Sequence, residues 1–162
     1  MNISKIKNFD VSNGEGVGVS VFVSGCHFHC PGCFNAEARD YDAGVPFDCS
    51  MMENIMEMMS SPFIDHLSVL GGEPLSQENL ENVAHIIKAT RAKFPDKPIW
   101  LWTGYKKQEL TDKQKEVVRL CSFITYGRFV MSKRDISRRF SGSSNQQTET
   151  PDGKIIEKAE EK

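Results

Sequence analysis

The sequence of 162 residues lacks the features that mark several special classes of protein. It has no apolar run near the ~20 residues that span a bilayer, which argues against a transmembrane protein. Its first ten residues hold no apolar signal-peptide core. Positive charge is not in excess, since 20 Lys and Arg stand against 22 Asp and Glu. That balance argues against a general nucleic-acid or membrane binder. We therefore expect a cytoplasmic protein that binds neither nucleic acid nor membrane.

Disulfide pairing and internal repeats are also missing. The five cysteines are an odd number in a chain with no export signal, which does not suggest a disulfide framework. Apolar residues make up 39% and charged residues 26%, as in ordinary globular proteins whose core needs no disulfide or metal cross-links. We expect one domain over residues 1–140. Residues 141–162 are polar and end in a charged stretch, so we expect a partly frayed tail.

Apolar patterning alternates between strands and helices along the chain. β-branched and apolar runs predict strands over residues 17–25, 66–72, 98–104 and 122–127. Helical spacing predicts helices over 50–61 and 76–94, with a third opened by the capping box of Thr111 and Gln114. Ser50 and Ser76 are the expected caps of the first two helices. This order is typical of an α/β fold with mainly parallel strands and right-handed crossovers.

Each predicted strand ends in glycine, namely at Gly25, Gly71-Gly72, Gly104 and Gly127. Ligands of parallel sheets bind at the carboxyl ends of the strands. Glycine at such a position lets the backbone approach a ligand closely. The sequence therefore predicts one ligand site rimmed by four strand ends.

The strongest chemical signal is a group of three cysteines, Cys26, Cys30 and Cys33, with the spacing C-x3-C-x2-C. Thiolates are the ligands of iron–sulfur clusters and of structural zinc. Three thiolates on one loop can hold three irons of a 4Fe–4S cube and leave the fourth iron open to a small molecule. That arrangement would let an electron pass directly to a bound substrate.

Two other interpretations of the cysteines stay open. Zinc could bind the three thiolates, with Cys49, His27 or His29 completing a tetrahedral site. Structural zinc loops normally pair two C-x2-C knuckles, however, and only one such spacing is present. A redox dithiol would use Cys30 and Cys33 and leave Cys26 without a role.

The loop CHFHCPGCFN resembles the cluster loop of radical S-adenosylmethionine (SAM) enzymes, and Gly71-Gly72-Glu73-Pro74 resembles the GGEP motif of that superfamily. Within it, the chain is similar to the family of glycyl-radical activases that serve anaerobic ribonucleoside-triphosphate reductase. The stretches that carry this similarity are NGEGVGVSVFVSGC, GCFN, IWLWTGY, YGRF and GSSNQ. Departures from the family pattern fall at Gly18, Phe34, Tyr126 and Ser141, where Arg, Tyr, an acid and Arg are usual.

The resemblance implies a radical SAM domain built as a partial (β/α) barrel. It implies that Cys26, Cys30 and Cys33 hold a 4Fe–4S cluster, and that SAM contacts Gly32, Cys33, Phe34, Gly71, Gly72 and Glu73. The implied enzyme is an oxidoreductase that cleaves SAM reductively and generates a glycyl radical on the reductase, its protein partner. A reduced flavodoxin or similar protein is the implied electron donor.

Alternatives remain at this point. The chain could be another radical SAM enzyme, such as a deazapurine synthase or the activase of a different glycyl-radical enzyme, or a zinc-binding interaction module. The basic run of Lys133, Arg134, Arg138 and Arg139 fits an acidic patch of a partner, a phosphate or a solvated helix face.

Overall fold

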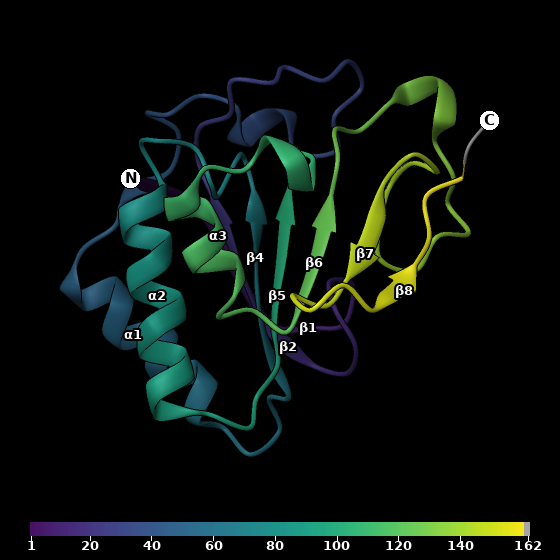
Figure 1. The fold of residues 1–162 in the computed structure, drawn as a ribbon. Coiled ribbons are helices and arrows are strands. Elements are labelled where there is room, and N and C mark those ends of the chain that lie inside the picture. Colours follow the sequence, from purple (N-terminus) through teal and green to yellow (C-terminus); the bar gives the residue numbers. More distant parts are fainter. Residues whose placement is uncertain (161–162) are drawn as a thin grey trace.

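A mixed sheet of eight strands organises the computed structural model, which describes residues 1–160 (Figure 1). The spatial order is β3-β1-β2-β4-β5-β6-β7-β8. The strands are β1 (Asn2–Asp10), β2 (Gly18–Val23), β3 (Val45–Pro46), β4 (His66–Gly71), β5 (Ile99–Thr103), β6 (Phe123–Tyr126), β7 (Gln147–Glu149) and β8 (Ile155–Glu157). The four central strands, β2, β4, β5 and β6, are parallel, and both edges are antiparallel. The predicted α/β class is confirmed.

Helices cover one side of this sheet in Figure 1. They are α1 (Cys49–Ser60), α2 (Leu80–Lys93) and α3 (Asp112–Val118), with single 3-10 turns η1 (Ala36–Ala38), η2 (Lys107–Glu109) and η3 (Met131–Lys133). Among the described residues, no helix is long and apolar enough to cross a membrane.

The helix caps agree with the sequence at one of three places. Thr111 and Gln114 form the predicted capping box of α3. Helix α1 is capped by Asp48, whose carboxylate accepts from the Met51 amide at 2.9 Å, so Ser50 is not its cap. Helix α2 begins at Leu80, later than predicted, and Ser76 lies in the turns before it.

Alternate residues of the parallel strands face opposite sides of the sheet. Toward the helices they are aliphatic and fill the main core, as with Val21, Val69, Leu101 and Ile124. The residues on the other face are aromatic or polar for the most part: Ser20, Phe22, His66, Ser68, Leu70, Trp100, Trp102, Phe123 and Thr125. The helix-free face is therefore built differently from the core.

The chain after residue 140 differs from the expected frayed tail. Strand β7 pairs antiparallel with β6, and β8 pairs with β7, so residues 147–157 extend the sheet at one edge. Side chains anchor this hairpin as well, because Thr148 shares a 2.7 Å hydrogen bond with Thr125 of β6. Residues 147–157 are therefore paired in the sheet, and residues 161–162 lie outside the described part of the chain.

Candidate functional site

A cavity of about 470 Å³ opens at the carboxyl ends of the parallel strands. It is lined by Cys26 after β2, Gly71 and Gly72 at the end of β4, Gly104 after β5 and Gly127 after β6. Its wall also includes Phe22, Leu70 and Trp102 from the helix-free face. Small-molecule sites commonly have volumes of roughly 300–1,000 Å³. Residues from all four parallel strand ends therefore line one cavity, at the place where the sequence predicts a ligand site.

The three loop cysteines all line this cavity. Cys26, Cys30 and Cys33 are free thiols of intermediate exposure. Cys49, by contrast, is exposed at the start of α1, and Cys121 is buried in the core. The structure thus separates the three clustered cysteines from the other two.

No group of three or more His, Cys, Asp or Glu among the described residues could hold a single metal ion. A 4Fe–4S cube has a different requirement, because each thiolate binds its own iron at a separate corner. Of the two loop histidines, His29 lines the cavity and His27 lies 3.3 Å from the Tyr105 hydroxyl.

The cysteine loop is closed by Arg39, which the sequence analysis missed. The Arg39 carbonyl accepts from the Cys26 amide at 2.9 Å, and its guanidinium donates to the Cys30 carbonyl. The Gly25 amide bonds the neighbouring Ala38 carbonyl at 2.8 Å. The ends of the loop therefore lie side by side, and one side chain reaches back to its middle. Arg39 stands outside the cysteine motif, so spacing alone gave no signal for it.

Glu73 lies almost fully buried at the end of β4, with 1% of its surface exposed. Its carboxylate accepts from the Thr103 hydroxyl at 2.8 Å, the Gly104 amide at 2.8 Å and the Leu75 amide at 2.9 Å. Burial raises the pKa of Glu73 to about 7, against the opposing effect of these three donors. The carboxylate ties the end of β4 to the end of β5 directly beneath the cavity.

The backbone at Gly72 approaches its neighbours too closely for a side chain. A Cβ there would lie 2.4 Å from the Gly25 carbonyl oxygen. The Gly72 amide donates to the Val23 carbonyl, and the Glu73 amide to the Gly25 carbonyl, both at 2.7 Å. The ends of β2 and β4 are thereby fixed to each other, which holds the cysteine loop against the glycines of the second motif.

Aromatic rings surround the mouth of the cavity. Phe34 contacts Phe129 with ring centroids 5.0 Å apart, although 59% of Phe34 is exposed. Phe28 packs edge-on against Tyr105 at 4.9 Å, and the Arg128 guanidinium lies 4.5 Å from the Phe28 ring centroid. The loop after β2 and the loop after β6 thus touch through these rings.

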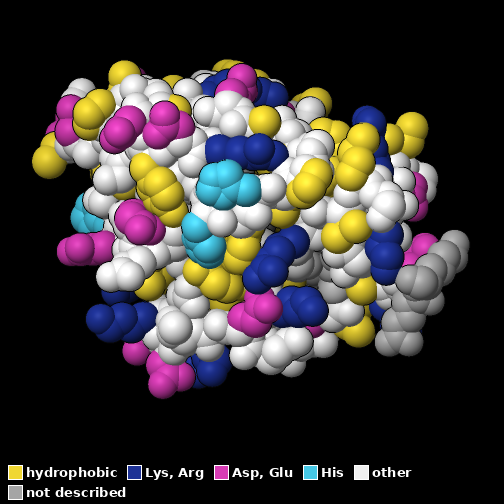
Figure 2. Space-filling view, turned by 90° about the horizontal axis from the view of Figure 1, so that it is seen from above, with side chains coloured by type: hydrophobic (Ala, Val, Ile, Leu, Met, Phe, Trp, Pro, Cys, Tyr) yellow, Lys and Arg dark blue, Asp and Glu magenta, His cyan; other side chains and the backbone are white. Residues whose placement is uncertain are grey.

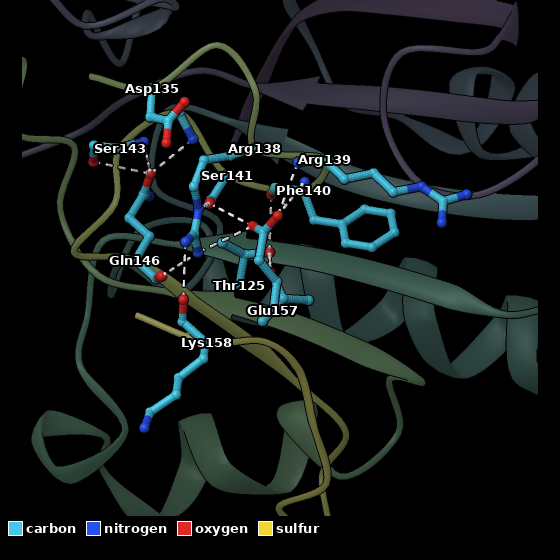
Figure 3. Close-up of polar contacts among 12 residues, drawn as sticks. Thr125, Asp135, Arg138, Arg139, Phe140, Ser141, Ser143, Gln146, Glu157 and Lys158 are labelled. Atoms are coloured by element: carbon cyan, nitrogen blue, oxygen red, sulfur yellow. Dashed lines mark hydrogen bonds and ion pairs between the residues drawn. The ribbon is translucent and has the colours of Figure 1, made fainter. Parts of the chain in front are cut away.

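A polar network forms another part of the cavity wall (Figure 3). Gln146 accepts from the Gly142 amide at 3.0 Å and donates to the Gly127 carbonyl at 2.8 Å. Glu157 of β8 accepts from the Arg139 amide at 2.8 Å and pairs with the Arg138 guanidinium at 3.3 Å. Since Gln146 belongs to the GSSNQ stretch, that motif serves to hold the wall against the end of β6. Glu157 lies in the predicted tail and was missed.

Known proteins resemble this chain over most of its length. The family model described as 4Fe-4S single cluster domain matches residues 12–149. Several curated relatives bear the name anaerobic ribonucleoside-triphosphate reductase-activating protein. That of Escherichia coli K12 is 37% identical over 148 residues, which is 90% of this chain and 96% of the relative. That of Haemophilus influenzae is 36% identical with the same coverage, and that of Enterobacteria phage T4 is 33% identical over 90% of this chain and 92% of the relative.

The matched model defines the class of the chain, which is a protein with a 4Fe-4S single cluster domain. Its relatives then narrow the class: the chain belongs to the family of anaerobic ribonucleoside-triphosphate reductase-activating proteins. The family resemblance drawn from the sequence is confirmed. The zinc module and the deazapurine synthase, both left open by the sequence, receive no support from these matches.

Proposed function

We propose that this chain is an iron–sulfur activating enzyme that cleaves SAM reductively and generates a glycyl radical on an anaerobic ribonucleoside-triphosphate reductase. One observation supports the assignment above all others. Three free thiols share a cavity with the strand end at Gly71, Gly72 and Glu73, in a chain that belongs to the activating-protein family. When bound, the cluster would supply the one electron that splits SAM into methionine and a 5′-deoxyadenosyl radical, and that radical would take a hydrogen atom from a backbone glycine of the reductase.

Cys26, Cys30 and Cys33 would each bind one iron of the cluster. The residues fit this role, because the thiols are neither paired in disulfides nor buried in the core. Burial raises the pKa of the Cys26 thiol, so iron must displace its proton on binding. Three ligands leave one iron free for SAM.

Six residues are proposed to contact SAM. Gly32, Cys33 and Phe34 would lie against the adenine, and Gly71, Gly72 and Glu73 would receive the amino group. Glu73 already accepts three hydrogen bonds from the protein, and a carboxylate offers about four acceptor positions. Its main task is therefore to fix the backbone of this strand end, with one position left for the ligand.

The sheet is proposed to act as a partial (β/α) barrel whose helix-free face lines the reaction space. Phe22, Leu70 and Trp102 from this face would exclude water beneath the cysteine loop. The described strands leave the cavity open to solvent, and the reductase is the proposed cover. The proposed electron donor is a reduced flavodoxin or similar protein, and the proposed compartment is the cytoplasm, where cysteines stay reduced.

The test is anaerobic reconstitution of the full chain with iron and sulfide, followed by addition of SAM, a reductant and the candidate reductase. The expected products are 5′-deoxyadenosine and a glycyl radical detected by electron paramagnetic resonance. Cys26→Ala, Cys30→Ala or Cys33→Ala should each abolish both, while Cys49→Ala serves as the matched control and should retain both. A colourless protein holding one zinc and no sulfide after the same treatment would refute the proposal.

A further inference from the structure

One strongly basic segment has no role in the function proposed so far. Residues 128–139, here called the rim segment, follow β6 and contain five basic residues and one acidic, in a chain whose net charge is −2. The structure forms the turn η3 and further turns here rather than an α-helix. The interpretation of the basic run as a solvated helix face, which the sequence left open, is therefore wrong.

The rim segment is fixed to the protein from its inner side. Its backbone is bonded at three points to residues 143–145, with the Ser144 amide donating to the Lys133 carbonyl at 2.8 Å. The Arg138 side chain is 7% exposed and is paired with Glu157. In Figure 3 Arg138 points into this network, while the side chain of Arg139 points away from it. A segment anchored in this way presents its outer side chains in fixed positions.

The outer side chains of the rim segment combine apolar surface with positive charge. Ile136 is 86% exposed, and the Ser137 amide and hydroxyl bond the Asp135 carboxylate at 2.9 and 2.6 Å in the turn that displays it. Arg134 and Arg139 are exposed beside it. Figure 2, which views this end of the molecule from above, shows hydrophobic side chains interleaved with Lys and Arg on its right-hand side.

The rim segment also borders the cysteine loop. The Arg134 guanidinium lies 5.3 Å from the Phe34 ring centroid, and a Cβ at Gly32 would lie 2.8 Å from the Met131 sulfur. Ile136 itself lines the cavity mouth. The rim segment therefore lies beside both the cavity and the cysteine loop, where a polypeptide substrate could contact it.

We propose that the rim segment docks an acidic, apolar-centred surface of the reductase, with Ile136 as the apolar anchor and Arg134 and Arg139 as the cations that meet its carboxylates. The inference rests on the proposed function and names the chemistry of its partner. Both side chains of the Arg139–Glu15 ion pair are exposed, so solvent screens their attraction. A carboxylate of the partner can therefore replace Glu15. An apolar centre with a charged rim is the usual organisation of such interfaces, and the charges favour fast association.

The experiment measures binding of the reconstituted full chain to the reductase and the yield of glycyl radical at limiting reductase. Ile136→Asp and Arg134→Glu are each expected to raise Kd by about tenfold or more, and Arg134→Glu to reduce the dependence of Kd on salt. Phe63→Asp and Lys113→Glu are matched controls, because Phe63 is 73% exposed before β4 and Lys113 is exposed on α3. Both controls should bind as the unchanged protein does.

The outcomes distinguish a failure of the docking proposal from a failure of the proposed function. If the unchanged chain yields no glycyl radical, the proposed function fails. If it does, and the two rim variants bind the reductase as tightly as the controls, the docking surface is refuted. Iron content is measured for every variant, and loss of iron in a rim variant would also refute docking, because the segment would then serve to shape the cluster site.

Discussion

The guanidinium of Arg39 donates a hydrogen bond to the carbonyl oxygen of Cys30, while the carbonyl of Arg39 accepts one from the amide of Cys26. Arg39, which lies outside the cysteine motif, thus holds the backbone at two of the three proposed cluster ligands. Groups that orient metal ligands without touching the metal commonly change metal affinity by 10–100-fold when removed. The loop geometry is therefore set from outside the motif.

Arg39→Ala is expected to lower the iron content reached in limited reconstitution, because the loop loses the bond to Cys30. Arg39→Lys should recover part of the loss, since one ammonium can still reach a carbonyl. Iron and sulfide assays and the visible absorbance of the cluster measure the effect. Arg119→Ala, at an exposed residue after α3, is the control. Equal iron in all four proteins would contradict the role of Arg39.

The raised pKa of Glu73 predicts how the stability of the cluster-free protein depends on pH. Burial raises its pKa from 4.5 to about 7, so the folded state holds this proton more tightly than the unfolded state. The resulting stabilisation is fully present below pH 4.5 and is lost as the pH rises through 7, by on the order of 3 kcal/mol. Urea unfolding between pH 5 and 8 measures it.

Glu73→Gln provides the comparison for this pH dependence. The amide cannot ionise, so its free energy of unfolding should change less over the same pH range. The variant should also be less stable at pH 5, because an amide NH2 would face the Thr103, Gly104 or Leu75 donors. Parallel pH profiles for the two proteins would show that another group is responsible.

Glu157→Ala should destabilise the wall of the cavity by about 2 kcal/mol or more, because it leaves the largely buried guanidinium of Arg138 without its carboxylate. The Arg138→Ala, Glu157→Ala double variant should lose less than the sum of the two single losses. Chemical unfolding of the three variants and the unchanged protein measures the coupling. Strict additivity would show that the pair does not act as a unit.

Thiol reactivity should distinguish the two cysteines that lie outside the loop. Burial raises the pKa of Cys121 to about 12, so its thiolate is scarce at pH 8 and access is blocked. Cys49 is exposed. Iodoacetamide at pH 8 should therefore label Cys49 and leave Cys121 unmodified in the folded protein, as read by mass spectrometry of peptides. Rapid labelling of Cys121 without unfolding would contradict its position in the core.

The sequence predicted the parallel strands and their helices well, because residues such as Val69 and Ile87 carry clear strand and helix periodicity. It missed β1, where lysines and two register shifts hide the alternation of the strand. It also missed β7 and β8, since polar residues such as Gln147 and Thr148 find their partners only in the folded sheet. Propensity describes such strands poorly, because their stability depends on tertiary neighbours.

The residues of the candidate site also fall into two groups, those that the sequence predicted and those that it did not. Local motifs pointed to the cysteines and to Glu73, and the structure brings these to one cavity. Arg39, Thr103 and Glu157 support that cavity through bonds between distant parts of the chain. Contacts of this kind leave no spacing pattern in a single sequence, so physical reasoning on the sequence alone had no means of finding them.

The contrast between the two faces of the sheet bears on how such an enzyme can diversify. Val69 and Leu70 are neighbours in β4, yet Val69 packs in the aliphatic core and Leu70 lines the cavity. Two adjacent residues thus have different roles: Val69 stabilises the fold, and Leu70 shapes the cavity. A mutant library restricted to Phe22, Leu70 and Trp102 would change the shape of the cavity and leave the aliphatic core residues of the same strands unchanged.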